Sequence, residues 1–445
     1  MRKQLISIGC AAAVGLSSLA ASTVAFGQGV TQYVPLFVYR TGPYASSGSL
    51  WFAGERDYFT YINDVEGGVN GVKINVEEFE TEYNPDRAVE AYERSKNGKD
   101  GSPTAFIMTH STPATYALMD RARKDKIPLF DPAGGPSESK NGLVFPYVFP
   151  LLLTYYGQGS VAVNWIAEEL GGFENLKGKK IVTVYHDSGY GRASQPVMVK
   201  LAEKYGFEDV QIPVAHPGSE QAAIWRQVRA EKPDYVVLRT WGVMTPVGIK
   251  TAKRFGIDTT KMLGDVWAGS KADMIPAGDA AIGYNAIAPY PGGADFEIHN
   301  RLKEHVIDTG KSNLANPEED FGAVYYNIGI VNAALAVEGM RVAMTKFGNR
   351  PLNGEEMRWG LENMTIDAAR LKDLGMTGLL QELQVTPMDH EGGGAARIQE
   401  WTGSGWKLQT DWIAVDDSVV DPLIEAKAAA YAKEQGITPR DLNTE

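Results

Sequence analysis

The sequence is poor in cysteine, in histidine and in positive charge. It holds one cysteine and six histidines among 445 residues, and 43 Lys and Arg side chains are outnumbered by 55 Asp and Glu, for a formal net charge of −12. With a single cysteine the chain forms no internal disulfide, so we expect the core alone to hold the fold. The histidines are not spaced as in a metal site, and we predict neither a metal nor another cofactor. The negative charge disfavours nucleic acid as a partner, because phosphates need a basic face.

The N-terminus has the composition of a secretory signal peptide. Arg2-Lys3 precedes an uncharged stretch of apolar and small residues at 5–25, and Ala25-Phe26-Gly27 is a plausible cleavage site. We therefore expect residues 1–27, which include Cys10, to be removed, and the mature protein to be soluble in the periplasm. An N-terminal membrane anchor is the alternative. No other segment is expected to reach the length of a membrane span.

Strand-like and helix-like segments alternate along most of the chain. This alternation is typical of parallel sheets covered by helices, and roughly 420 residues exceed what one core usually serves, so an α/β protein of two lobes is predicted. The strands are expected at 33–39, 72–80, 104–109, 127–130, 180–185, 209–214, 234–238, before Gly264, and at 281–287. Helices are expected after residue 50 and at 85–97, 113–124, 157–170, 190–205, 220–230, 244–255, 295–308, 320–346 and 422–435.

The stretch from residue 33 to residue 71 is the most informative part of the chain. An apolar strand at 33–39 runs into a loop of small residues at 41–49, and the helix that follows carries apolar residues at helical spacing (Trp51, Tyr58, Ile62 and Val65). Glycines in the GGVNG segment at 67–71 end that helix. A loop at the carboxyl end of a strand is where ligands bind in α/β sheets.

This stretch also carries a family resemblance. TGPYASSGSLWFAGERDYFTYINDVEGGVNG resembles the opening of the periplasmic branched-chain amino-acid binding protein family, the type I solute-binding proteins of ABC importers. The likeness extends, with gaps, from about Tyr33 to about Trp406. It implies a two-lobe type I periplasmic binding protein, in which each lobe is a parallel sheet flanked by helices and three crossovers join the lobes. A small-molecule ligand in the cleft between the lobes, and an ABC permease in the inner membrane as partner, are implied as well.

The resemblance also implies how the chain divides. Lobe one is expected at residues 28–150 and 288–390, and lobe two at residues 151–287 and 391–445, with the C-terminal helix included. The segment Gly392–Trp406 resembles the final crossover hairpin of the family.

Two turns of lobe one match positions at which the family holds the carboxylate of its ligand. Ser111 and Thr112 follow the strand that ends at Thr109, and the resemblance implies a ligand-binding hydroxyl there. A cap on the next helix is the alternative role. Gly134 and Gly135 stand in DPAGGP, where the family has a hydroxyl residue, and their backbone amides could still face an anion. An ordinary tight turn is the alternative there.

In lobe two the resemblance implies an aromatic wall and points to a missing acid. Tyr190 matches the tyrosine that closes over the ligand, and Trp241 matches another wall residue. Arg239 is either a salt-bridge residue or a carboxylate partner. Val266 stands where family members that carry amino acids have an acid for the ammonium group, and an unpaired buried ammonium is costly. Asp265 is one position away, so an amino-acid ligand stays open as an alternative.

Six aromatic side chains fall at cleft positions of the family, and they favour a flat apolar or aromatic solute: Tyr44, Trp51, Tyr190, Trp241, Trp267 and Tyr325. Core packing is the alternative for each. The hypothesis is an aromatic or other bulky apolar solute, either a carboxylate or a neutral analogue.

We predict a binding protein and not an enzyme. The segment Gly157–Ala162 satisfies G-x-G-x-x-A, but it does not follow the tight strand-to-helix turn that dinucleotide binding requires. The sequence also has no local signature of a catalytic triad. A ligand-sensing receptor module is the alternative within the same fold, and an extracytoplasmic hydrolase is the alternative from another class.

Overall fold

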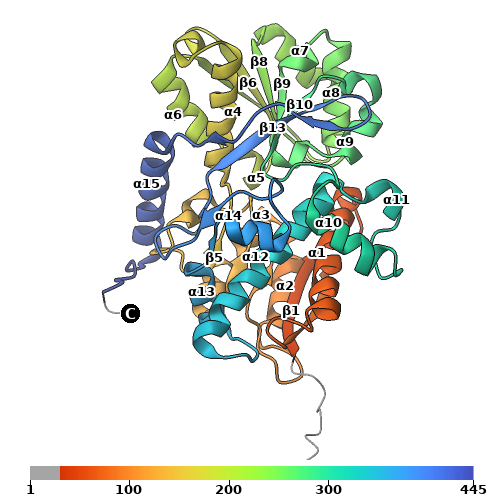
Figure 1. Cartoon of the computed structure of the whole chain (residues 1–445). Coiled ribbons are helices and arrows are strands. Elements are labelled where there is room, and N and C mark those ends of the chain that lie inside the picture. Colours follow the sequence, from red (N-terminus) through yellow and green to blue (C-terminus); the bar gives the residue numbers. More distant parts are fainter. Residues whose placement is uncertain (1–30, 444–445) are drawn as a thin grey trace, which may run out of the picture.

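The computed structural model describes residues 31–443, and in them two β-sheets lie one above the other with helices around each (Figure 1). The predicted signal peptide and Cys10 lie outside the described residues. The predicted fold class is confirmed, because strands and helices alternate and most strand pairs are parallel.

The first sheet has five parallel strands in the order β2-β1-β3-β4-β5. Their bounds are β1 (Thr31–Val38), β2 (Lys73–Glu80), β3 (Ile107–Met108), β4 (Leu129–Phe130) and β5 (Val148–Phe149). The strand β1 is buried along almost its whole length, since it lies between two neighbours and beneath helices. Helices near this sheet are α1 (Ala45–Val65), α2 (Pro85–Ser95), α3 (Thr112–Asp125), α12 (Val324–Phe347), α13 (Gly354–Glu362) and α14 (Ala368–Leu374).

The second sheet runs in the order β14-β13-β10-β9-β8-β6-β7, and β15 pairs with β13. Its strands are β6 (Lys180–His186), β7 (Glu208–Val214), β8 (Tyr235–Arg239), β9 (Met262–Gly264), β10 (Asn285–Ala288), β13 (Ala395–Trp401), β14 (Trp406–Leu408) and β15 (Ile413–Ala414). Its helices are α4 (Tyr155–Glu169), α5 (Gly189–Arg192), α6 (Gln195–Tyr205), α7 (Ala222–Glu231), α8 (Met244–Arg254) and α9 (Lys271–Ala277). The strand β13 is antiparallel to β10, so this sheet is parallel only in part.

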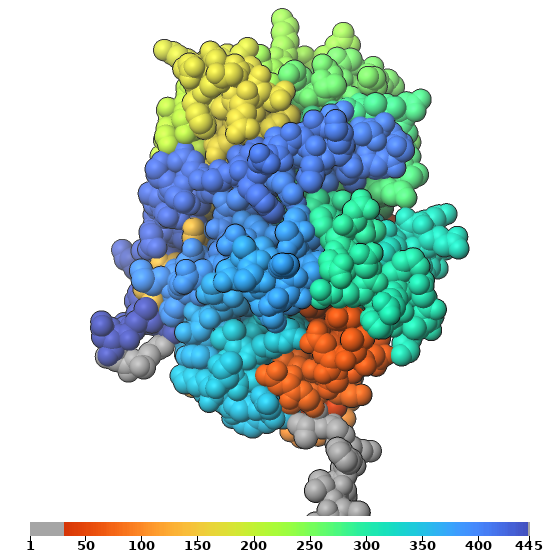
Figure 2. All heavy atoms as spheres, in the orientation of Figure 1, coloured from red at the N-terminus to blue at the C-terminus, as the bar shows by residue number. Residues whose placement is uncertain are grey.

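The chain passes between the two sheets three times, after β5, after β10 and before β13. These passages bring segments far apart in the sequence together. In Figure 2 the blue segments near the C-terminus lie across the middle of the molecule, in contact with parts of the chain from both halves. The residue boundaries proposed for the lobes stay a prediction.

Several predicted elements are wrong in extent. The helix expected at 190–205 is two helices, α5 and α6, because Pro196 lacks an N–H and starts a new first turn. The helix expected at 320–346 is α11 (Pro317–Asp320) and α12, separated where Phe321 is extended. The helix expected at 295–308 is α10 (Glu297–Leu302) followed by a π-helical turn at 303–307, and the strand expected at 281–287 is only β10. The helices α13 and α14 and the pair of strands β11 (Thr365–Ile366) and β12 (Leu383–Gln384) were not predicted from the sequence.

The helix α12 is long and apolar enough to cross a membrane by length and composition, so the expectation of no further segment of that length is wrong. Its most apolar window is 83% buried inside the protein, as in the core helix of a soluble protein. It packs closely on α1. A Cβ built on Gly54 would lie 2.1 Å from the carbonyl oxygen of Tyr326, and one on Gly329 would lie 2.1 Å from that of Trp51. Glycine at both positions therefore lets the two backbones touch.

The helix α15 (Asp417–Gln435) begins earlier than predicted and contacts both halves of the molecule (Figure 1). Near its start, Asp416 accepts a hydrogen bond from the Tyr205 hydroxyl at 2.7 Å, on the side of the second sheet. Further along, the Tyr431 hydroxyl donates to Asp120 at 2.9 Å, on the side of the first sheet.

Candidate functional site

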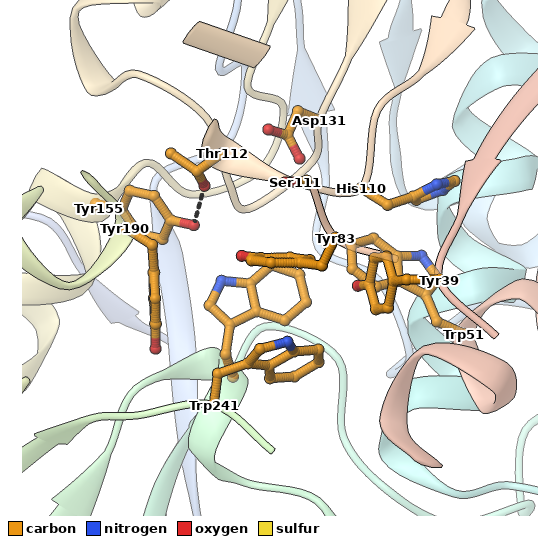
Figure 3. Close-up of a pocket in the computed structure, with 11 residues that line it drawn as sticks. Tyr39, Trp51, Tyr83, His110, Ser111, Thr112, Asp131, Tyr155, Tyr190 and Trp241 are labelled. Atoms are coloured by element: carbon orange, nitrogen blue, oxygen red, sulfur yellow. Dashed lines mark hydrogen bonds between the residues drawn. The ribbon is translucent and has the colours of Figure 1, made fainter. Parts of the chain in front are cut away.

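A cavity lies where the carboxyl ends of strands from both sheets meet (Figure 3). Residues that follow β1, β3 and β4 contribute from the first sheet, and residues that follow β6, β8 and β9 contribute from the second. The space not filled by atoms is about 280 Å³ and is partly open to solvent. The residues that line it are Tyr39, Trp51, Tyr83, His110, Ser111, Thr112, Asp131, Tyr155, Tyr190, Trp241 and Trp267.

Aromatic side chains make most of the cavity wall. Trp51 of α1 stacks on Trp267, which follows β9, with ring centroids 4.9 Å apart and an angle of 23° between the rings. Trp241 meets Trp267 edge to face at 5.6 Å. The contact between Trp51 and Trp267 joins the two sheets across the cavity. Aromatic rings of this kind can stack on a flat solute. The indole nitrogens of Trp241 and Trp267 are buried and have no hydrogen-bond partner among the described residues.

The hydroxyl groups expected to bind the ligand line the cavity but also have partners in the protein. Ser111 caps α3, and its hydroxyl accepts from the N–H of Ala114 at 3.4 Å. The Thr112 hydroxyl lies 2.7 Å from that of Tyr155, so the two share a hydrogen bond. The capping role and a place in the wall therefore coexist at Ser111.

His110 is held by a buried acid behind the wall. Its Nε2 lies 2.8 Å from a carboxylate oxygen of Glu55, and its Nδ1 lies 2.9 Å from the carbonyl oxygen of Phe37. Burial alone would lower the pKa of His110, but the nearby Glu55 outweighs burial and raises it. Burial raises the pKa of Glu55 in turn. The pair carries no net charge whichever group holds the proton, and both ring nitrogens are occupied.

Asp131 directly follows β4, and its carboxylate points into the cavity (Figure 3). It is only 2% exposed, and Oδ2 accepts a hydrogen bond from the Thr115 hydroxyl at 2.7 Å. Burial raises its pKa to about 6, with Thr115 and His110 acting in the opposite direction. A Cβ built on Gly134 would lie 2.8 Å from Oδ1 of Asp131, so a side chain there would crowd the carboxylate.

The second acid near the site, Asp265, is fully engaged by the protein. Arg239 lies 3.4 Å from it, the Tyr190 hydroxyl donates to it at 2.7 Å, and the N–H of Trp267 donates to it at 3.1 Å. The Arg239 guanidinium also lies over the rings of Tyr155 and Tyr190. Arg239 is thus the salt-bridge residue of the two roles considered for it, and Tyr190 faces the cavity with its hydroxyl turned to Asp265.

Tyr325 stands behind the wall and supports it. Its hydroxyl donates to the carbonyl oxygen of Trp267 at 2.6 Å and lies 3.2 Å from Asp273. Burial raises the pKa of Asp273 to about 8, so at neutral pH its carboxyl group carries a proton that it can donate to the Tyr325 oxygen. Both contacts are then satisfied, and the loop with Trp267 is held in place.

Tyr44 links the two sheets beside the cavity and does not line it. Its hydroxyl lies 2.9 Å from Nε2 of His186, at the end of β6, and 2.6 Å from Nδ1 of His216, in the loop after β7. Burial, helped by the neighbouring His216, lowers the pKa of His186 to about 4. Because the tyrosine has one proton, it donates to one imidazole and accepts from the other.

The structure thus separates the predicted site residues into two groups. Trp51, Ser111, Thr112, Tyr190, Trp241 and Trp267 line the cavity, whereas Tyr44, Gly134, Gly135 and Tyr325 lie beside or behind it. Their contact with a solute stays a prediction. The sequence analysis missed Tyr39, Tyr83, His110, Asp131 and Tyr155. For His110 and Asp131 the signal was present, since each lies within two residues of the end of a strand at the ligand-binding edge.

The site contains no evident metal-binding group. Within residues 31–443, no cluster of three or more His, Cys, Asp or Glu side chains is placed to hold a metal ion.

A family comparison decides what kind of protein this is. The model of a family described as periplasmic binding protein matches residues 31–405. The chain belongs to this family. Its members bind solutes and are not catalytic, and membership implies a periplasmic location. A comparison with curated protein sequences finds no match.

Solved structures place this periplasmic binding protein among ABC transporter proteins. A crystal structure described as an ABC transporter permease, from the Pseudomonas fluorescens group, is 56% identical, with a TM-score of 0.88 over 93% of this chain and 99% of that one. A branched-chain amino acid ABC transporter from Thermus thermophilus with bound valine is 23% identical, with a TM-score of 0.73 over 88% of this chain and 99% of that one.

A solute-binding protein from R. palustris in complex with benzoate is 18% identical, with a TM-score of 0.64 over 87% of this chain and 98% of that one. The Thermus thermophilus and R. palustris proteins are too distant in sequence for more, so their likeness to this chain shows the fold alone. The function of the present chain is solute binding in an ABC transporter context.

Proposed function

We propose that this protein collects a small hydrophobic or aromatic solute in the periplasm and delivers it to the permease of an ABC importer. The observation that carries the proposal is the aromatic wall, to which both sheets contribute Trp and Tyr side chains. Such side chains bind flat apolar molecules by stacking and add polar groups at the ring edge. The cavity is narrow, so a solute enters when the sheets move apart and is enclosed when they close.

The amino-acid alternative lacks its usual anchor at the position considered for it. Asp265 already has an arginine, a tyrosine hydroxyl and a backbone N–H as partners, and Val266 has no charge. Withdrawing Asp265 to bind an ammonium group would leave Arg239 buried without its counter-charge, which is costly. This observation argues against Asp265 as the anchor for the ammonium group of an amino acid.

A carboxylate on the solute would need neutral donors. The cavity wall contains no Lys or Arg among the described residues. The free indole N–H groups of Trp241 and Trp267 are donors that could hold such a group. The benzoate complex of the R. palustris protein is an example of an aromatic carboxylate on this fold. For the present chain the carboxylate stays part of the proposal.

Recovery of the natural solute tests the proposal. The mature protein is purified without denaturation, and the small molecule that accompanies it is identified by native mass spectrometry. A thermal-shift panel of aromatic acids, aromatic amides, aromatic alcohols and branched-chain amino acids follows, with calorimetry for each compound that raises the melting temperature. We expect one aromatic or bulky apolar solute per chain and no turnover. Binding of branched-chain amino acids alone would contradict the proposed solute class.

The permease partner is tested in cells. A cross-linker placed on the exposed surface should capture the permease of one importer, and deletion of that permease should abolish uptake of the solute. Capture of a membrane kinase or receptor in its place would favour the sensing alternative.

A further inference from the structure

Asp131 places a carboxylate in the cavity wall, and a purely apolar or aromatic solute would make no hydrogen bond to it. Thr115 donates to its Oδ2 at 2.7 Å, and no described residue donates to its Oδ1. The side chain is 2% exposed and is aimed into the space between the aromatic rings (Figure 3). An acceptor that faces the cavity without a donor is unfavourable, and more so when it is charged. A solute that supplied a donor would remove that cost.

The charged groups around Asp131 compensate its carboxylate only in part. His110 is the nearest ionisable neighbour, but its two nitrogens are taken up by Glu55 and the carbonyl oxygen of Phe37. Arg239 is engaged by Asp265, and the remaining ionisable groups near Asp131 are tyrosines, namely Tyr39, Tyr83, Tyr155 and Tyr290. With a pKa of about 6, Asp131 is mostly ionised above pH 7.

On the basis of the proposed function, we infer that Asp131 selects solutes that present a hydrogen-bond donor, a hydroxyl or a protonated amine, at one end of an aromatic body. The aromatic rings bind the body of the solute, and the free carboxylate oxygen accepts from its donor. A site built to hydrogen-bond a solute group discriminates strongly against the analogue that lacks it. An anionic group near Asp131 would be repelled by it, so any carboxylate on the same solute lies toward the indole N–H groups of Trp241 and Trp267.

Matched probes test this inference in the wild-type protein. Calorimetry at pH 7.5 compares 4-hydroxybenzoate with 4-methoxybenzoate, which differ by the donor, and benzylamine with benzoate, which differ in the charge facing Asp131. We expect the donor-bearing member of at least one pair to bind roughly 10- to 100-fold more tightly, as charge-assisted hydrogen bonds do. The pair that discriminates more shows whether the donor is a hydroxyl or an amine.

The variant Asp131→Asn assigns the selectivity to this side chain. It keeps the shape and removes the charge, and it should reduce the preference to within about threefold. Asp209→Asn is the matched control, because burial raises the pKa of Asp209 to about 6 as well, but it lies on β7 and does not line the cavity. It should keep the wild-type preference. Circular dichroism and thermal melting confirm that both variants fold.

The outcomes separate the inference from the proposed function. Equal binding within both probe pairs, or full selectivity in Asp131→Asn, overturns the role of Asp131 while aromatic binding stands. If no aromatic probe binds the wild-type protein, the proposed solute class fails and the inference fails with it.

Discussion

Two buried acids occupy corresponding places at the edges of the two sheets and have different surroundings. Asp131 directly follows β4 and Asp265 directly follows β9, and burial raises the pKa of each to about 6. Asp265 is held by Arg239, Tyr190 and the backbone of Trp267, whereas among the described residues only Thr115 donates a hydrogen bond to the carboxylate of Asp131. A strand end thus brings an acid to the site, and its partners decide whether it supports the protein or remains free for a solute.

The largest expected effect comes from removing the partner of Asp265. Arg239→Met should lower the free energy of unfolding by about 3 to 5 kcal/mol, because it leaves a buried carboxylate without a counter-charge. Urea denaturation at pH 7.5 measures the loss. The double variant Arg239→Met with Asp265→Leu is the control, and it should recover much of the stability since neither charge remains. A single variant as stable as wild type would show that the ion pair is not what distinguishes the two acids.

The second prediction concerns the pH dependence of stability without solute. The pKa of Asp131 is raised from its ordinary value of 3.8 to about 6 in the folded protein, so the folded state binds the proton more tightly than the unfolded state. This contribution to stability is complete below pH 4 and is lost as the pH rises through 6. At pH 7.5 the loss is on the order of 2 to 3 kcal/mol.

Asp131→Asn cannot ionise and should escape that loss. Its unfolding free energy relative to wild type should therefore increase between pH 4 and pH 7.5 by up to about 2 to 3 kcal/mol, measured by urea denaturation at each pH. A constant difference between the two proteins across this range would mean that the fold compensates the charge of Asp131.

The third prediction compares the aromatic wall with the core. Trp241→Ala should weaken binding of the best aromatic probe by roughly 10- to 100-fold, because stacking surface is lost. Trp225→Ala is the matched control, since Trp225 is fully buried in the core of the second sheet. It should lower stability by about 3 to 5 kcal/mol, more than Trp241→Ala does. Unchanged affinity together with an equal loss of stability would assign Trp241 to the core.

The comparison of the two acids also shows how far the sequence alone leads. The order of strands and helices follows from periodicity, and wall residues such as Tyr190 and Trp241 follow from the resemblance to the family. Asp265 was singled out for its position, but its pairing with Arg239 depends on side chains from two strands. Asp131 stood unnoticed in the DPAGGP loop, because no sequence pattern reports which way a carboxylate points or what neutralises it. Tyr83 lies in the loop after β2 and Tyr155 begins α4, so they come together only in the folded chain.

The smallest expected effect is on the link between the sheets. Tyr44→Phe removes the hydroxyl that contacts His186 and His216, and it should weaken binding of the best aromatic probe about two- to tenfold in calorimetry. The reason is that the closed arrangement loses a hydrogen bond that joins the two halves. Tyr92→Phe is the control, because the Tyr92 hydroxyl donates to Asp125 within the first half at 3.0 Å. It should lower stability by a similar amount and leave affinity unchanged. If both variants bind alike, the hydroxyl of Tyr44 does not favour closure, and the site depends on its wall alone.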